Sequence, residues 1–130
     1  MSRIFNADLE LLPSLARTAT TNSSQIENEE TYRGIRALIN VTNVTTSGVV
    51  TVSVQGYDEV LAGYFTYITS AALTASGITI VKVHPELIAV TNAVAQDFLT
   101  DKWRVAVTHT GFDGGNPASV TYAVTAHMLK

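Results

Sequence analysis

The sequence predicts an all-β fold, an antiparallel β-sandwich of about seven to eight strands in a jelly-roll or immunoglobulin-like arrangement, with an extended N-terminal arm. Residues 102–110 and 119–126 place apolar side chains at every second position, which is the period of a strand with one buried face. Clusters of turn-forming residues recur about every 8–12 positions, a spacing typical of a sandwich. Only residues 85–100 have a pattern that would suit a helix.

The composition is that of one compact domain with few charges. A chain of 130 residues with 46% hydrophobic residues can bury a core large enough to fold without covalent cross-links. The charged fraction is 15%, against about 25% in typical soluble domains, which favours a surface that packs against other proteins. The sequence contains no cysteine, so disulfides, thiolate metal sites and cysteine nucleophiles are excluded.

Charge and hydropathy argue against two classes of partner. The net charge is −3 and lysines and arginines do not cluster, so we expect no nucleic-acid partner. No stretch approaches the roughly 20 consecutive apolar residues of a membrane-spanning helix. The first residues also lack the apolar run of a secretion signal, so we expect no membrane partner.

Residues 1–31 are predicted to form an N-terminal arm and edge segment, distinct from a sandwich domain at residues 32–130. Residues 1–14 hold a short leucine-rich run that ends at a proline and is too short for a stable helix. This run either folds onto its own domain or docks on a neighbouring protein. Residues 14–24 are polar and extended, as in an edge strand, and residues 25–31 are predicted to be an exposed acidic loop.

The longest predicted strand covers residues 32–44, and the next covers residues 49–57. The turn-forming residues 45–48 between them favour a hairpin. Residues 58–63 then connect to a short strand at residues 64–69, which has aromatic side chains on both faces.

One further strand is predicted at residues 78–84, apolar enough to be covered on both faces. Residues 85–100 follow, where Leu87, Val90 and Val94 have helical spacing. This segment is either one or two helical turns or an irregular crossover between the sheets.

The last two strands, residues 102–110 and 119–126, flank a dense cluster of turn formers at residues 111–117. We therefore expect a C-terminal antiparallel hairpin that carries the only tryptophan and on which the rest of the chain packs. The inner faces of the sandwich should hold Ile39, Val41, Val52, Val54, Ile80, Trp103, Val105, Val107, Tyr122 and Val124.

The histidines do not have the spacing of a metal site or a catalytic site. His84, His109 and His127 lie at or near strand ends, and no two of them are separated by one or three residues. We interpret them as ordinary strand-end side chains.

The carboxylates likewise do not have the arrangement of a catalytic pair or a calcium site. Asp58–Glu59 and the pair Asp97 and Asp101 are not placed to flank one cleft, as a glycosidase requires. The glycine-rich residues 112–116 lack the ligand register of a calcium loop and suit a tight hairpin instead. The sequence therefore predicts no enzyme, no cofactor and no metal, but a binding or structural module.

Tyrosines gather around one connection in the chain. Tyr57, Tyr64 and Tyr67 lie close together in the sequence, with Phe65 among them. They form either an exposed aromatic patch that anchors a partner, or a small core that closes one end of the sandwich.

Several short segments recur in a recognisable order and spacing along the chain. They are Leu12-Pro13-Ser14, Arg17-Thr18-Ala19-Thr20, Arg33-Gly34, Ile39-Asn40-Val41-Thr42-Asn43-Val44, Val54-Gln55-Gly56-Tyr57-Asp58, residues 69–77, Val83-His84-Pro85-Glu86-Leu87, residues 103–109 and residues 119–124. In this order they resemble a family of small β-sandwich proteins encoded among the virion structural genes of tailed double-stranded DNA phages. Members often carry a proline in the loop after the Gly-Lys/Tyr-Asp step, where this sequence has residues 59–63 instead.

The resemblance implies a capsid decoration or cement protein, made in the bacterial cytoplasm, that binds outside the major capsid protein shell and stabilises it. It also implies self-association, with a trimer as one form, and no enzyme activity. We hypothesise that residues 1–31 bind neighbouring capsid subunits, because an extended arm can add to a partner's sheet edge. The apolar residues of the arm that would bind the capsid are Ile4, Phe5, Leu9, Leu11 and Leu12.

Three other functions are compatible with the sequence. A tail, baseplate or head-fibre component shares the fold and the virion location. A carbohydrate-binding module would need an exposed aromatic platform, for which Tyr57, Tyr64 and Tyr67 are the candidates. An enzyme is the weakest alternative, and an open pocket with a histidine and a carboxylate in contact would favour it.

Overall fold

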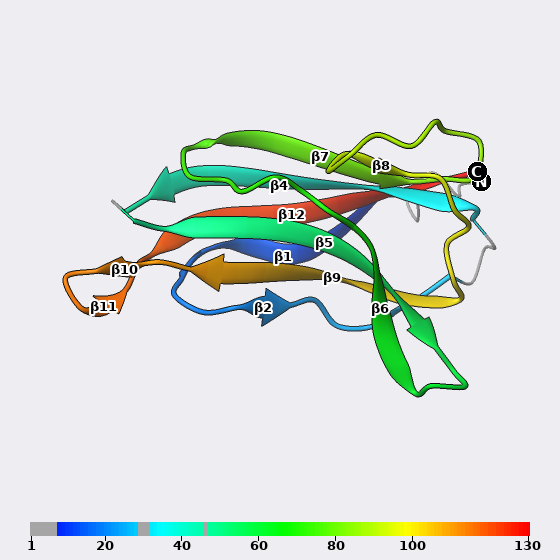
Figure 1. Cartoon of the computed structure of the whole chain (residues 1–130), viewed down its shortest axis with the longest axis horizontal. Helices are drawn as coiled ribbons and strands as arrows, with labels where there is room; N and C mark the ends of the chain where they lie inside the picture. Colours follow the sequence, from blue (N-terminus) through cyan, green and yellow to red (C-terminus); the bar gives the residue numbers. More distant parts are fainter. Residues whose placement is uncertain (1–7, 29–31, 46) are drawn as a thin grey trace.

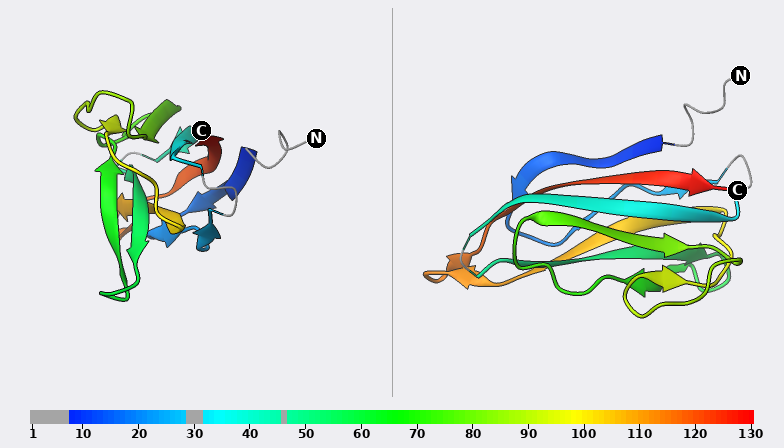
Figure 2. Two further views of the ribbon diagram at one scale, coloured as in Figure 1. Left: turned by 90° about the vertical axis from the view of Figure 1, so that its right-hand side faces the viewer. Right: turned by 90° about the horizontal axis from the view of Figure 1, so that it is seen from above.

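Two β-sheets packed face to face make up the fold (Figures 1 and 2). A computed structural model describes residues 8–28, 32–45 and 47–130. Sheet A has the strand order β1-β12-β4-β7-β8, and sheet B has the order β2-β9-β5-β6, with β3 also paired to β9. The strands are β1 (Asp8–Arg17), β2 (Thr21–Asn22), β3 (Ile26–Glu27), β4 (Gly34–Val44), β5 (Val49–Asp58), β6 (Gly63–Thr69), β7 (Gly77–Val83), β8 (Val94–Ala95), β9 (Lys102–Thr110), β10 (Phe112–Asp113), β11 (Asn116–Pro117) and β12 (Val120–Leu129).

The structure confirms an all-β sandwich of two mostly antiparallel sheets, but it has more strands than predicted. The two-residue strands are the main addition: β2, β3 and β8 extend the sheet edges, whereas β10 and β11 pair with each other in a small separate hairpin. Such segments are too short to leave an alternating pattern in the sequence. No helix among the described residues is long and apolar enough to cross a membrane.

The four long central strands bury alternate side chains, as the sequence predicts. Ile39 in β4, Val52 in β5, Val105 in β9 and Val124 in β12 are fully buried. Their inward faces meet between the sheets and form one hydrophobic cluster with Trp103. Each such side chain contributes about 1.5–3 kcal/mol on burial, so these inner faces are the main source of stability.

The strand at the border of sheet A departs from the prediction. Ile80 does not belong to the core: it is 40% exposed, and Ile78 is 63% exposed. Both side chains lie on the outer face of β7, whereas Val81 and Val83 on the inner face are buried. The expectation that this strand is covered on both faces is therefore wrong. An apolar run has the same pattern whether or not another layer of the protein covers the outer face of the sheet.

The two predicted hairpins do not form. β9 pairs with β5 in sheet B, whereas β12 pairs with β4 in sheet A. β4 and β5, the other predicted hairpin, are likewise divided between the two sheets. The two strands of each predicted hairpin therefore lie in opposite sheets and are not paired with each other through backbone hydrogen bonds. Alternation reports only which face is buried, and either arrangement buries the same face.

The loops after β4 and after β9 carry the chain from one sheet to the other at the same end of the sandwich (Figure 1, left). We refer to these two loops as the crossing loops. The Thr45 N–H donates to the Ser119 carbonyl oxygen at 3.0 Å, and the Ser119 N–H donates to Thr45 Oγ1 at 2.9 Å. At Gly111, with φ of +102°, an added Cβ would lie 1.9 Å from the Ser47 carbonyl oxygen. The crossing loops therefore lock against each other.

The N-terminal residues that the structure describes are part of the sandwich. β1 is an edge strand of sheet A that pairs with β12, and its register shifts on either side of Leu12. The chain then crosses to sheet B, where β2 and β3 pair with β9. Of the two possibilities for residues 1–14, the part from Asp8 onward folds onto its own domain, and residues 1–7 lie outside the described residues.

Residues 85–100 form an irregular crossover and contain no helical turn. Backbone hydrogen bonds fasten the crossover to the strands around it. The Lys82 N–H donates to the Ala93 oxygen at 2.8 Å, and the Leu99 N–H donates to the Arg33 oxygen at 3.0 Å. The apolar residues with helical spacing do not form one buried face, since several of them, such as Val90, are exposed.

We predict that Gly111→Ala destabilises the protein strongly, because the added methyl group would overlap Ser47 and the positive φ disfavours any side chain. Gly114→Ala is the matched control: its φ is +62° but nothing lies within 4 Å of the added Cβ. Thermal unfolding should show a small loss for the control, about 1–2 kcal/mol, and a clearly larger loss for Gly111→Ala. Equal losses would contradict the locked loops.

Candidate functional site

The β5–β6 hairpin bends away from the body of the sandwich at the end opposite the crossing loops (Figure 1, lower right). β5 and β6 pair from Ser53↔Thr69 to Asp58↔Gly63, with a register shift between Val54 and Gln55. The end view in Figure 2 shows the same hairpin extending beyond the rest of sheet B. Its turn is therefore well placed to contact another molecule.

The turn of this hairpin is held by one carboxylate. Asp58 Oδ1 accepts hydrogen bonds from the Val60 N–H at 2.8 Å and the Leu61 N–H at 3.1 Å. Ala62 closes the turn with a φ of 54°. Val60 and Leu61 are 92% and 79% exposed. We refer to these two residues as the hairpin tip: a pair of aliphatic side chains in water on an ordered turn.

Two of the predicted tyrosines lie next to the hairpin tip, on the outer face of sheet B. Tyr57 and Tyr64 are cross-strand partners, with ring centroids 5.1 Å apart in an edge-to-face arrangement. The Arg104 guanidinium lies 3.8 Å from the centroid of the Tyr64 ring. Arg104 is held in place because its Nε donates to Gln55 Oε1 at 2.8 Å, and the Tyr64 hydroxyl donates to Gln25 Oε1 at 2.6 Å.

A second cation lies beside the first. Lys102 Nζ lies 3.0 Å from Glu59 Oε2 and 6.0 Å from the centroid of the Tyr57 ring. The hydrogen bond that the Lys102 ammonium donates to the Glu59 carboxylate raises the pKa of Lys102. We refer to Tyr57, Tyr64, Lys102 and Arg104 together as the hairpin platform. Tyrosine and arginine, together with tryptophan, are the residue types most enriched among interface hot spots.

The third predicted tyrosine lies on the other face of the hairpin. Tyr67 packs against the core and stacks edge-to-face on Phe65 at 4.9 Å. An added Cβ at Gly56 would lie 2.7 Å from Phe65 and 2.8 Å from Tyr67, so these rings cover the backbone at this point. The Tyr67 hydroxyl donates to the Phe98 carbonyl oxygen at 2.6 Å, and burial raises the pKa of the Tyr67 phenol. The structure therefore places two of the three tyrosines on an outer surface and one at the closed end of the core.

The described members of the predicted capsid-binding set pack against the protein's own core. Leu12 is buried, and Leu9 and Leu11 are half-buried against the same hydrophobic cluster. Ile4 and Phe5 lie outside the described residues. While β1 stays in sheet A, the Leu12 side chain is not available to a partner.

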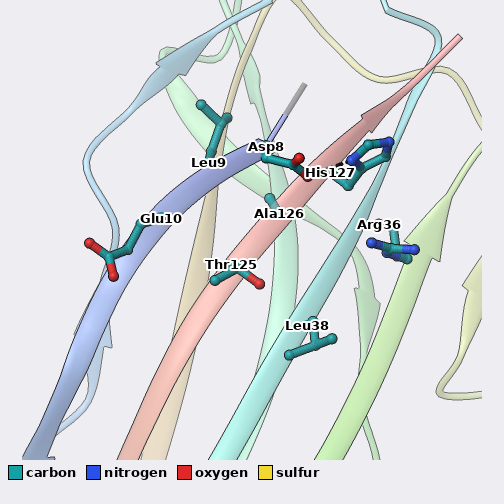
Figure 3. Close-up of a pocket in the computed structure, with 8 residues that line it drawn as sticks. All are labelled: Asp8, Leu9, Glu10, Arg36, Leu38, Thr125, Ala126 and His127. Atoms are coloured by element: carbon teal, nitrogen blue, oxygen red, sulfur yellow. Dashed lines mark hydrogen bonds and ion pairs between the residues drawn. The ribbon is translucent and has the colours of Figure 1, made fainter. Parts of the chain in front are cut away.

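A shallow depression of about 360 Å³ lies on the outer face of sheet A, between β1, β12 and β4 (Figure 3). At its rim His127 Nδ1 lies 2.6 Å from Asp8 Oδ1, so this depression does contain a histidine and a carboxylate in contact. In the described part of the chain, however, neither His127 nitrogen hydrogen-bonds to a hydroxyl or thiol that could act as a nucleophile. Both side chains are more than one third exposed, which gives no low-dielectric site. The residues around the depression are Asp8, Leu9, Glu10, Arg36, Leu38, Thr125, Ala126 and His127.

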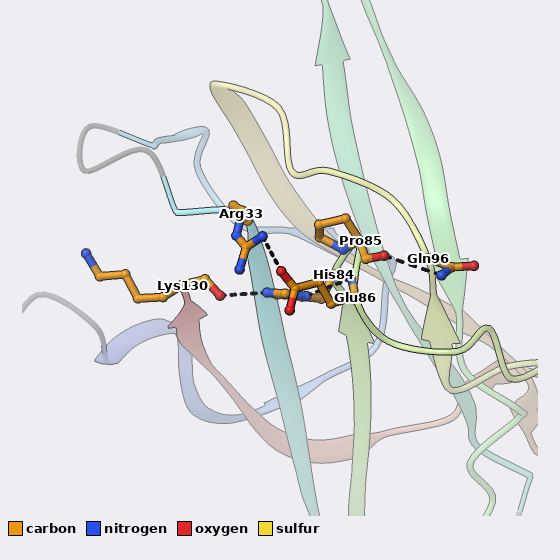
Figure 4. Close-up of polar contacts among 6 residues, drawn as sticks. All are labelled: Arg33, His84, Pro85, Glu86, Gln96 and Lys130. Carbon is orange, nitrogen blue, oxygen red and sulfur yellow. Dashed lines mark hydrogen bonds and ion pairs between the residues drawn. The ribbon is translucent and has the colours of Figure 1, made fainter.

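The other histidines have structural partners. His84 is buried, its Nε2 donates to the Lys130 main-chain oxygen at 2.7 Å, and its Nδ1 accepts from the Glu86 N–H at 3.1 Å (Figure 4). His109 Nε2 lies 2.6 Å from the Ala118 oxygen. Across the residues that the structure describes, no three histidine or acidic side chains converge as a metal site would require.

Neither a family model nor a curated protein matches this sequence.

Sequence reasoning missed the hairpin tip and the cations of the platform. Val60 and Leu61 follow two carboxylates in a short connection, which is the pattern of a solvated turn. Arg104 alternates with the buried residues of β9, and that alternation already assigns it to the outer face. The sequence does not reveal the β5–β6 register, and this register is what places the Tyr64 ring next to the Arg104 guanidinium.

We predict that Asp58→Ala loosens the hairpin tip, because the N–H groups of Val60 and Leu61 lose their shared acceptor. The cost should be about 0.5–2 kcal/mol, together with faster hydrogen exchange of those two amides. Glu59→Ala removes only an exposed ion pair and should change the unfolding free energy by less than about 1 kcal/mol. Unchanged amide exchange in Asp58→Ala would contradict the assigned role of the carboxylate.

Proposed function

We propose that this protein is a structural component of a tailed phage particle, which binds the outside of the major capsid protein shell as a decoration or cement protein. The hairpin tip and the hairpin platform are its docking surface. The observation that carries the proposal is the exposure of Val60 and Leu61, 92% and 79%, on a turn fixed by hydrogen bonds. The jelly-roll or immunoglobulin-like arrangement expected from the sequence belongs to the same proposal.

The hairpin tip suits docking because burying its apolar side chains would be favourable and would cost little conformational entropy. Fully burying a valine and a leucine contributes about 1.5–3 kcal/mol each. Because the turn is already ordered by Asp58, little conformational entropy is lost on binding. The tip therefore has the properties of a preorganised apolar anchor.

The hairpin platform adds polar specificity around the anchor. Arg104 and Lys102 are cations beside two tyrosine rings, and the hydrogen bond from Arg104 Nε to Gln55 Oε1 helps to hold the guanidinium beside Tyr64. An acidic or carbonyl-rich surface would complement Arg104, whereas Lys102 is already paired with Glu59. The same geometry disfavours a sugar platform, since Arg104 already lies over one face of the Tyr64 ring.

The rest of the molecule supports a structural role. The chain has a charged fraction of 15%, and its resemblance is to phage virion proteins. A capsid presents many identical sites, so a modest affinity per copy is enough for full occupancy once copies also contact one another. The described N-terminal strand is built into sheet A, which leaves the hairpin end as the more accessible surface.

The test is co-sedimentation of the protein with capsids that have been stripped of it. We predict saturable binding of the unaltered chain at a fixed ratio to the major capsid protein. The double variant Val60→Ser/Leu61→Ser should bind at least about thirtyfold more weakly, because two apolar anchors are lost. Phe112→Ser is the matched control: Phe112 is 65% exposed at the far end of the molecule, and this variant should bind normally.

Other results of the co-sedimentation experiment would favour another docking surface or another function. Saturable binding that is equally strong in the double variant would retain the capsid role but reject this docking surface. Recovery of the protein on purified tails, with none on capsids, would instead favour a tail, baseplate or head-fibre component. Binding to neither particle, together with binding to a glycan array, would favour the carbohydrate-binding alternative.

A further inference from the structure

The border of sheet A formed by β7 has an open backbone edge. β4 pairs with one side of β7 along its whole length, while β8 pairs with the other side only at Lys82 and Val83. Figure 1 shows β8 beside the C-terminal end of β7 alone. Residues 77–81 therefore have no strand on their outer side within the part of the chain that the structure describes. We refer to residues 77–81 as the window. It is bounded at one end by β8 and at the other by Gly77, where the chain arrives from sheet B.

The hydrogen-bonding groups that point out of this edge can be assigned. The Lys82 N–H donates to the Ala93 oxygen and the His84 N–H donates to the Ala95 oxygen, both away from β4. Outward-pointing residues alternate along a strand, so the backbone N–H and C=O of Ile78 and Ile80 point outward as well. Both isoleucine side chains lie on the outer face of the sheet, 63% and 40% exposed.

The opposite border of sheet A shows how an edge is usually protected. β1 carries Pro13, charges at Asp8 and Arg17, and two register shifts. Charges, prolines and bulges are the devices that prevent strand-to-strand association. The window at residues 77–81 has none of these, and its register with β4 is unbroken. This contrast within one sheet indicates that the β7 edge is kept free for pairing.

We infer that the β7 edge pairs with the β7 edge of a second copy of this chain, antiparallel about a two-fold axis at Thr79. In this register Ile78 faces Ile80 of the second copy, Ile80 faces Ile78, and Thr79 faces itself. The pairing uses outward-pointing residues on both sides, so all four N–H groups of the isoleucines find a carbonyl oxygen. It joins the two copies of sheet A into one continuous sheet.

The sequence of the window is self-complementary for this arrangement. Gly77-Ile78-Thr79-Ile80-Val81 has its two large outer side chains placed symmetrically about Thr79. The pairing gathers four isoleucines on one face, beside Leu38, which is the partner of Ile80 on β4. No charge of one copy faces a like charge of the other, since the nearest, Lys82, lies outside the window. A contact of five residues per strand is small, so we expect a weak, concentration-dependent dimer. The inference does not rest on the proposed function.

Sedimentation velocity of the full chain over a wide concentration range tests the dimer. We expect a reversible monomer–dimer equilibrium. Ile78→Lys and Ile80→Lys should each raise the dimer dissociation constant at least about tenfold, because the two-fold axis makes every substitution act twice. Leu15→Lys is the matched control: Leu15 is 58% exposed on β1, at the other border of the same sheet, and this substitution should leave the equilibrium unchanged.

Cross-linking tests the register without relying on the stability of those variants. The chain has no cysteine, so Thr79→Cys introduces a single thiol at the predicted axis. Directly opposed residues of a non-hydrogen-bonded antiparallel pair have Cα atoms about 4.5 Å apart, which a disulfide can span. Mild oxidation should convert this variant to a covalent dimer. Thr108→Cys, at an exposed position of β9 in the other sheet, should remain monomeric.

Three results would overturn the inference. One is a chain that stays monomeric at all concentrations, with no disulfide in Thr79→Cys. Another is an oligomer, a trimer for instance, that is insensitive to both isoleucine substitutions. The third is a monomeric chain whose capsid binding is lost in Ile80→Lys, which would mean that the edge pairs with a strand of the capsid protein.

Discussion

The contact between the two crossing loops determines how the rest of the chain is arranged. Thr45 and Ser119 exchange hydrogen bonds across it, and Gly111 lies against Ser47 where no side chain would fit. Because both loops change sheet at this point, β4 and β12 come together in sheet A and β5 and β9 come together in sheet B. The central pair of each sheet, β4 with β12 and β5 with β9, thus joins strands far apart in the sequence. The free end of the sandwich, opposite the crossing loops, is left for the β5–β6 hairpin.

Much of the fold could be predicted from alternation alone, and the failures have a common cause. The inward faces of β4, β5, β9 and β12 were predictable because Ile39, Val52, Val105 and Val124 recur with the period of a strand. Strand pairing was not, because facing strands and hydrogen-bonded strands bury the same residues. Ile80 was assigned to the core for the same reason: an apolar side chain at a strand position does not reveal whether its outer face is covered.

The candidate site was only partly predictable. Tyr57 and Tyr64 were identified because they lie close together in the sequence, and their cross-strand pairing keeps them together in space. Tyr67 was grouped with them because it is close in the sequence. In the structure the β5–β6 register shifts at Tyr67, and Tyr67 lies on the other face of the hairpin, where it stacks edge-to-face on Phe65. Val60 and Leu61 gave no signal, since two apolar residues in a turn show neither period nor motif. Their significance comes from the hydrogen bonds that the Val60 and Leu61 N–H groups donate to Asp58, because these order the turn.

The surface of the molecule therefore divides into protected and open parts. The β1 border carries a proline and charges, whereas the β7 edge and the hairpin tip expose apolar groups on ordered backbone. We propose that the hairpin end faces a capsid shell. A cryo-electron microscopy reconstruction of the particle that contains this protein would show the contact. We expect sandwich-shaped density outside the shell, with Val60 and Leu61 at the contact with the major capsid protein. Density on the tail, or on the capsid with the hairpin pointing into solvent, would contradict it.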